Sequence, residues 1–155
     1  MRKIHFGQAL VLLGMLTACG GAKDAPADST AMAPAPAMAA APKLSDFAGT
    51  WNMTSTLAGV EKPVTSTLMG SADGATWTIT LEGRPNVPVT ASIVGDSLIS
   101  QTAEYESILR KGVMVTVRTA SVLSNGMLMG NMVATYKTPK GEEVVVGTTS
   151  ATKAP

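Results

Sequence analysis

The sequence predicts an all-β domain over residues 44–155, an antiparallel up-and-down meander of about eight strands. Apolar and polar residues alternate with period two along its clearest segment, and turn signals separate short runs rich in β-branched residues. These 112 residues are enough for one domain but not for two. Residues 1–18 and 19–43 lack this pattern.

The clearest strand covers residues 75–82, where Ala75, Trp77, Ile79 and Leu81 alternate with Thr76, Thr78, Thr80 and Glu82. Successive side chains of a strand point to opposite faces, so the first set forms an apolar face and the second a polar one. Similar runs predict strands at residues 50–57, 64–69, 87–94, 97–102, 113–123, 126–137 and 143–152. Residues 103–109 fit either a short helical turn or a bent strand.

Turn residues occupy the short connections between these runs. Asn125-Gly126 is the strongest signal, because both residues tolerate the positive φ of a type I′ hairpin turn. Strands joined this tightly run antiparallel. An open meander would leave two unpaired edges and a bare apolar face, so the sequence favours a closed or nearly closed barrel, with a β-sandwich as the alternative.

The N-terminus has the layout of an export signal over residues 1–18. Arg2 and Lys3 precede an apolar run at residues 9–16 that is too short to span a bilayer. The run ends in Leu16-Thr17-Ala18-Cys19, which resembles the lipobox of bacterial lipoproteins. The resemblance implies that Cys19 is acylated and begins the mature chain, which is then held in a membrane by N-terminal acyl chains. In Gram-negative lipoproteins the residue after the cysteine influences sorting. A glycine rather than an aspartate at position 20 therefore implies an outer-membrane location facing the periplasm.

A low-complexity segment follows Cys19, with ten alanines and four prolines in residues 20–42. The prolines interrupt any continuous helix, and nothing in the segment can build a core. We therefore expect residues 19–43 to be a disordered tether, which would reach on the order of 70 Å if fully extended.

Composition excludes several functional classes. Without residues 1–18 the chain has ten basic and eleven acidic side chains, a formal charge of −1, so it lacks the clustered cations that nucleic-acid binding requires. It then has no histidine, and its one cysteine carries the lipid. Ser/His/Asp and Cys/His catalysis and imidazole-bound zinc or haem are excluded within a single chain. We expect no nucleic-acid partner, no cofactor, no metal, no disulfide and no enzymatic activity.

Two family resemblances bear on the domain. Gly49-Thr50-Trp51, after Phe47-Ala48, resembles the Gly-x-Trp opening of lipocalin-type barrels, in which a tryptophan on the first strand plugs one end. The match is short, the domain is smaller than usual lipocalins, and no arginine on the last strand clearly covers Trp51. Residues 95–98, 105–112 and 133–136 also resemble small uncharacterised bacterial lipoproteins, which implies no known activity.

Two groups of residues could carry chemistry. Met127, Met129 and Met132 could offer thioether ligands to Cu(I), although alternation separates Met132 unless Gly130 forms a bulge, and core packing is the favoured interpretation. Glu104 and Glu106 would project from one strand face about 7 Å apart, a spacing suited to paired-carboxylate glycoside chemistry. A solvated edge is the favoured interpretation of this pair.

Other motifs have plain interpretations. Ser150-Ala151-Thr152-Lys153 has the Ser-x-x-Lys spacing of serine acylases, but that motif requires a helix and this segment predicts a strand. Arg110, Lys111 and Arg118 could attract an acidic head group but are interpreted as solubilising. The aromatic residues Phe47, Trp77 and Tyr136 are interpreted as core or rim residues.

Together these patterns predict a lipid-anchored, non-enzymatic barrel of the cell envelope. Its partner would be a small apolar or amphipathic ligand or an envelope protein. The alternative is a structural or protein-interaction module of the periplasm with a solid core. An interior cavity near 300 Å³, roughly the lower end of ligand sites, would favour the ligand.

Overall fold

The structure, a computed structural model, describes residues 40–155, which are almost entirely β. A short 3-10 helix, η1 (Leu44–Phe47), precedes the strands. The strands are β1 (Gly49–Leu57), β2 (Val64–Gly70), β3 (Trp77–Leu81), β4 (Val87–Val94), β5 (Ser97–Thr102), β6 (Tyr105–Glu106), β7 (Met114–Ser124), β8 (Met127–Thr138) and β9 (Gly141–Lys153). The predicted export signal at 1–18, Cys19 and the predicted tether up to residue 39 lie outside the described residues.

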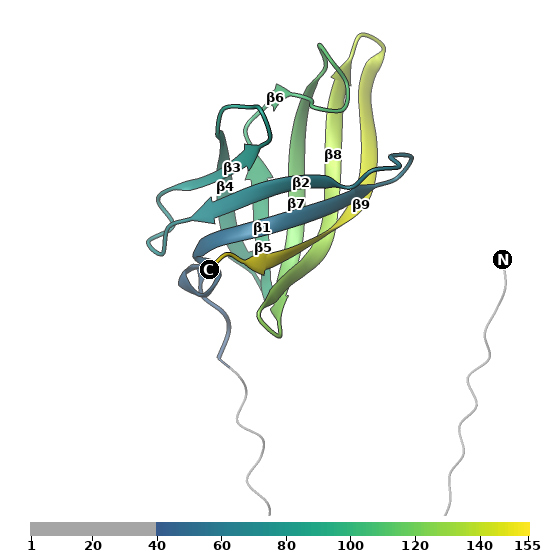
Figure 1. Cartoon of the computed structure of the whole chain (residues 1–155). Helices are drawn as coiled ribbons and strands as arrows, with labels where there is room; N and C mark the ends of the chain where they lie inside the picture. Colours follow the sequence, from purple (N-terminus) through teal and green to yellow (C-terminus); the bar gives the residue numbers. More distant parts are fainter. Residues whose placement is uncertain (1–39) are drawn as a thin grey trace, which may run out of the picture. The chain divides into compact units, whose positions relative to one another are not determined.

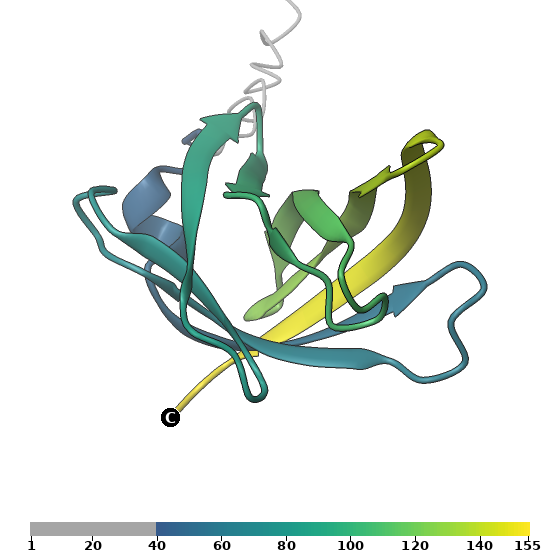
Figure 2. The same ribbon diagram turned by 90° about the horizontal axis from the view of Figure 1, so that it is seen from above.

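Eight of these strands form a closed antiparallel barrel (Figure 1). Strands β1 to β5 pair in sequence order, β7 to β9 do the same, β1 pairs with β9, and β5 pairs with β7 to close the ring. Seen from above, the strands curl around one interior (Figure 2). The predicted barrel is confirmed and the sandwich alternative is wrong, because closure leaves none of the eight strands with a free edge.

The segment after β5 contains the two-residue strand β6 and then a turn, so neither alternative predicted for residues 103–109 describes the whole segment. Both β5 and β6 pair with β7, through Gln101↔Arg118 and Tyr105↔Val115. The first residues of these pairs are four positions apart and their partners only three, so the chain carries one extra residue, as in a β-bulge. The Thr102 hydroxyl accepts a hydrogen bond from the Val117 N–H at 2.9 Å within this irregular region.

Phe47 and Trp51 plug one end of the barrel, which we call the closed end. Both are almost fully buried, at 0% and 1% exposure, and Trp51 Nε1 donates a hydrogen bond to the Phe47 carbonyl oxygen at 2.8 Å. Lys153 lies opposite Trp51 in the sheet, with its ammonium 5.5 Å from the centroid of the indole ring. The last strand has no arginine that covers Trp51, and Lys153 instead provides a cation beside the indole ring.

The interior consists of two apolar clusters separated by small hydroxyl side chains. The closed-end cluster contains Phe47, Trp51, Met53, Leu68, Trp77, Leu98, Leu128 and Ala151. The second cluster, toward the other end, contains Leu57, Val115, Met132, Ala134 and Tyr136. Between them lies a hydroxyl belt of buried residues, Ser55, Ser100, Thr119, Ser121 and Thr149. Ser55 donates to Thr149 at 3.2 Å and Ser100 is hydrogen-bonded to Thr119, so these buried polar groups have partners.

Gly130 lies where β8 presses closely on β7. A Cβ atom at this position would meet the Ala120 carbonyl oxygen and would stand 2.7 Å from Ser121 Cα. These are backbone atoms of a paired strand, which cannot move aside without distorting the ladder. Glycine is therefore required for the close approach of the two strands at this point.

Candidate ligand pocket beneath a strap

Residues 103–112, here called the strap, connect β5 to β7 across the open end of the barrel, opposite the plug (Figure 1). Strand β6 attaches the strap to β7, and the Ser107 N–H donates to the Val113 carbonyl oxygen at 2.8 Å. The Ser107 hydroxyl accepts hydrogen bonds from the backbone N–H groups of Leu109 and Arg110, both at 3.1 Å. A buried serine thus fixes the turn of the strap.

Three ion pairs fasten the strap to three other parts of the barrel. Glu104 pairs with Lys137 on β8, Glu106 with Arg84 in the β3–β4 turn at 3.4 Å, and Arg110 with Glu143 on β9. The last pair is bidentate, with two N···O distances of 2.7 Å. In all three pairs both side chains are at least one-third exposed, so water screens the attraction between the charges.

Hydrogen bonds lower the pKa of two of these carboxyl groups. The Gly112 N–H and then Arg84 hold the pKa of Glu106 below its usual range, and Arg110 does the same for Glu143. A general acid of a glycosidase needs the opposite shift. The lowered pKa values therefore fit groups that hold the strap by charge.

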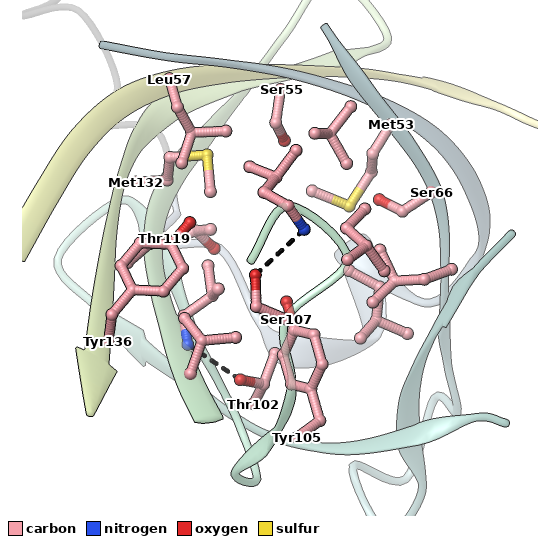
Figure 3. Close-up of a pocket in the computed structure, with 18 residues that line it drawn as sticks. Met53, Ser55, Leu57, Ser66, Thr102, Tyr105, Ser107, Thr119, Met132 and Tyr136 are labelled. Carbon is pink, nitrogen blue, oxygen red and sulfur yellow. Dashed lines mark hydrogen bonds between the residues drawn. The ribbon is translucent and has the colours of Figure 1, made fainter. Parts of the chain in front are cut away.

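Beneath the strap lies a small interior cavity of about 60 Å³ (Figure 3). Its hydroxyl lining comes from Ser55, Ser66, Thr102, Ser107 and Thr119. Its apolar lining includes Met53, Leu57, Met132 and, from the strap, Ile108 and Leu109. The volume is about one fifth of that of a small ligand site. The barrel interior is therefore largely filled by its own side chains.

A larger surface hollow, about 570 Å³, lies beside the strap and is open to solvent. Arg110, Glu143 and the β1–β2 turn line it. Leu109 and Tyr136 line both this hollow and the interior cavity, so these two side chains form the partition between them. Arg110 lies over the Tyr136 ring at 4.2 Å from its centroid, which helps to hold that side of the partition.

The partly buried phenol of Tyr105, on the strap, is expected to make the fold less stable at alkaline pH. Burial, and secondarily the neighbouring Tyr136, raises the pKa of Tyr105 to about 12. An unfolded tyrosine releases its proton near pH 10, so between about pH 10 and 12 ionisation favours the unfolded state. We expect the free energy of unfolding to fall by about 2 kcal/mol over this window, as measured by urea unfolding at successive pH values. In Tyr105→Phe this part of the loss should vanish, and an unchanged pH profile would contradict the burial of the phenol.

The three methionines do not gather into a thioether site. Met127 and Met129 lie on the outer face of β8, whereas Met132 is buried inside the barrel. The pairing of β8 with β7 continues without a bulge at Gly130. The Cu(I) hypothesis is therefore wrong, and the core interpretation holds for Met132 alone.

The carboxylate pair predicted at residues 104 and 106 is also divided. Glu104 and Glu106 take separate cations from different elements, Lys137 and Arg84. Both carboxylates lie at a partly exposed edge, and each fastens the strap to a different element.

Arg110, interpreted as solubilising, proves to be a strap residue, whereas Lys111 and Arg118 are exposed. Ser150 and Lys153 lie on strand β9, so the Ser-x-x-Lys spacing has no helix to support it. Phe47, Trp77 and Tyr136 are buried, as predicted.

Sequence reasoning did not find the strap ion pairs or the hydroxyl belt. The belt had a signal, since Ser55 continues the period-two series of Trp51 and Met53 on β1. The ion pairs had none, because their partners are 22 to 33 residues apart in sequence.

Comparison of the sequence with protein-family models gave no match, and comparison with curated proteins gave none either. Within residues 40–155, no three His, Cys, Asp or Glu side chains are grouped so that they could hold a metal ion. None of the helices in this part of the chain has the length and apolar character needed to cross a membrane.

Proposed function

We propose that this chain is a lipid-anchored, non-enzymatic protein of the bacterial cell envelope whose packed barrel acts through its surface, as a structural or protein-interaction module. The observation that carries the surface role is the interior cavity of only about 60 Å³. A barrel filled by its own side chains has little room for a guest molecule.

The lipid anchor is supported by the lipobox resemblance of Leu16-Thr17-Ala18-Cys19. At about 0.8 kcal/mol per buried CH₂, two or more acyl chains would hold the protein essentially permanently in a bilayer. Gly20 supports an outer-membrane location facing the periplasm. The absence of histidine after residue 18 supports a non-enzymatic role, because the buried hydroxyls then have no imidazole base to activate them.

Replacing Cys19 with alanine tests the anchor. The wild-type chain is expected to fractionate with the outer membrane and to carry acyl mass on its N-terminal peptide. Cys19→Ala should lose the acyl mass and leave the outer-membrane fraction, as followed by fractionation and mass spectrometry. The control Ser29→Ala, in the same segment, should behave like the wild type. Unchanged fractionation of Cys19→Ala would contradict the anchor.

A second candidate function is the binding of a small amphipathic ligand beneath the strap. The shared partition of Leu109 and Tyr136 favours it, because movement of Leu109 would join the apolar cavity to the open hollow. The strap is also fastened by exposed ion pairs, which individually resist displacement only weakly.

Titration with a fluorescent fatty acid separates the two candidates. A packed module is expected to show no saturable binding in the wild-type protein. Saturable binding that Leu109→Ala strengthens would favour the ligand-binding function instead. Val144→Ala is the control, because Val144 is exposed and lines neither the cavity nor the hollow.

A further inference from the structure

The charged side chains are distributed unevenly along the barrel axis. Within residues 40–155, twelve of the eighteen Asp, Glu, Lys and Arg side chains lie toward the open end, in residues 58–63, 82–86, 103–112 and 137–143. The β7–β8 hairpin, by contrast, has no charged side chain from residue 119 to residue 136. The open end is therefore strongly hydrated, and the hairpin side of the closed end is not.

Exposed apolar side chains cross the outer surface at that uncharged side. Val94, Val122 and Met129 are linked through the strand register by way of Ser97, from β4 across β5 and β7 to β8. They are 63%, 37% and 53% exposed. Met127 continues this outer surface to the hairpin tip and is also exposed. We call this surface the apolar rim; it consists of Val94, Val122, Met127 and Met129.

The N-terminal side of the domain begins at the same end. Phe47 of η1 belongs to the closed-end cluster, and Leu44 packs against it. In Figure 1, η1 and the tip of the β7–β8 hairpin both lie at the lower end of the barrel, away from the strap. Residues 20–43 separate Cys19 from η1.

From this placement we propose that the apolar rim docks on the surface of the bilayer that holds the acyl chains of Cys19, so that the barrel stands on its closed end with the strap facing away. This proposal rests on the lipid anchor of the proposed function. It assigns the outer surface a defined partner, a lipid surface, and it leaves the strap and the adjoining hollow accessible from the aqueous side.

The physical basis is that docking is intramolecular once the chain is anchored. The composition of residues 20–43 predicts a flexible tether, and a flexible chain of this length has an average end-to-end distance on the order of 30 Å, which would keep the domain at high effective concentration near the bilayer. Under that condition a few partly exposed apolar side chains are enough, because each is removed from water without desolvating a charge of the hairpin. The charged open end stays in water.

Site-directed labelling of the full acylated protein tests this orientation. Acylation blocks the thiol of Cys19, so a cysteine introduced elsewhere is the only free thiol. Met129→Cys and Val94→Cys report on the rim. Val144→Cys is the matched control, because Val144 is 58% exposed on the outer face of β9, six residues or ~20 Å along the strand from the partner of Met129. Each variant is labelled with an environment-sensitive fluorophore.

The labelled proteins are reconstituted in zwitterionic vesicles of phosphatidylcholine and phosphatidylethanolamine. Anionic lipids are avoided because they would repel Asp96, which adjoins Val94 in the β4–β5 turn. With a nitroxide-labelled lipid as quencher, the two rim labels are expected to lose most of their emission and to shift to shorter wavelength. The Val144 label should keep its emission. Far-ultraviolet circular dichroism establishes that each variant retains its strand content.

Equal quenching at all three positions, or none at the rim while the protein floats with the vesicles, would overturn the docking proposal and leave the anchor intact. A further outcome is that pyrene labels at position 129 form excimers in detergent and in vesicles, with no quenching by the labelled lipid. That result would mean that the rim binds a second copy of the chain, and it would also overturn the docking proposal. A wild-type protein without acyl mass that fails to float would instead refute the anchor.

Discussion

Trp51→Ala is expected to lower the free energy of unfolding by about 3–5 kcal/mol, the range for deletion of a large buried aromatic side chain. The indole is 1% exposed and packs in the closed-end cluster. Its loss would leave a cavity at the plug and remove the hydrogen bond that ties the barrel to the Phe47 carbonyl of η1. The effect should therefore include loosening of η1 as well as loss of buried area.

Urea unfolding followed by circular dichroism measures this change. Trp51→Phe, which keeps most of the apolar volume but loses the indole N–H, should cost distinctly less. Lys153→Ala, which removes the cation beside the ring, should cost about 1 kcal/mol or less, since the ammonium is exposed. If Trp51→Ala stayed within about 1 kcal/mol of the wild type, the plug would not be a main source of stability.

Gly130→Ala is expected to cost about 3 kcal/mol, near the upper end for overpacking, although it adds a single methyl group. The new Cβ would meet the Ala120 carbonyl oxygen and the Ser121 Cα and Oγ atoms. A flexible side chain could rotate away, but paired backbone cannot. The β7–β8 ladder would have to shift, and with it the hydroxyl belt at Thr119 and Ser121.

The matched control is Asn131→Ala, at the next residue of the same strand, whose side chain is exposed on the outer face. It should change stability by about 0.5 kcal/mol or less. Thermal and urea unfolding of both variants would distinguish a local steric effect from a general sensitivity of β8. Equal stability of Gly130→Ala and the wild type would mean that the strands separate easily at this position.

Local sequence signals were sufficient for most of the strands. Strand β5 has the predicted bounds, and the Asn125-Gly126 turn separates β7 from β8 as predicted. The prediction was too long at residues 75 and 76, which lie in the turn before β3. There Asp73 and Ser71 accept hydrogen bonds from the N–H groups of Ala75 and Thr76, so side-chain turn chemistry replaces the strand ladder.

The candidate site was less predictable, because its parts are far apart in the sequence and meet only in the folded sheet. The strap carries Glu104, Glu106 and Arg110 within seven residues, and alternation alone treats them as a polar edge. Lys137 and Glu143 lie near the strap because β6 pairs with β7, which is followed in the sheet by β8 and β9, whereas Arg84 in the β3–β4 turn belongs to the other side of the ring that the β5–β7 pairing closes. The bulge between β5 and β6 likewise has no local signature such as a glycine.

The pairing of β1 with β9 joins the first and last strands of the domain, and Ser55 and Thr149, which it brings into contact, are 94 residues apart. Such a high contact order makes folding slow, since most of the chain must be ordered before this pair can form. The ring also cannot close before β9 has formed, because β9 is the strand that joins β1 to β8. A chain without β9 would keep two unpaired strand edges, so closure depends on the last element of the domain.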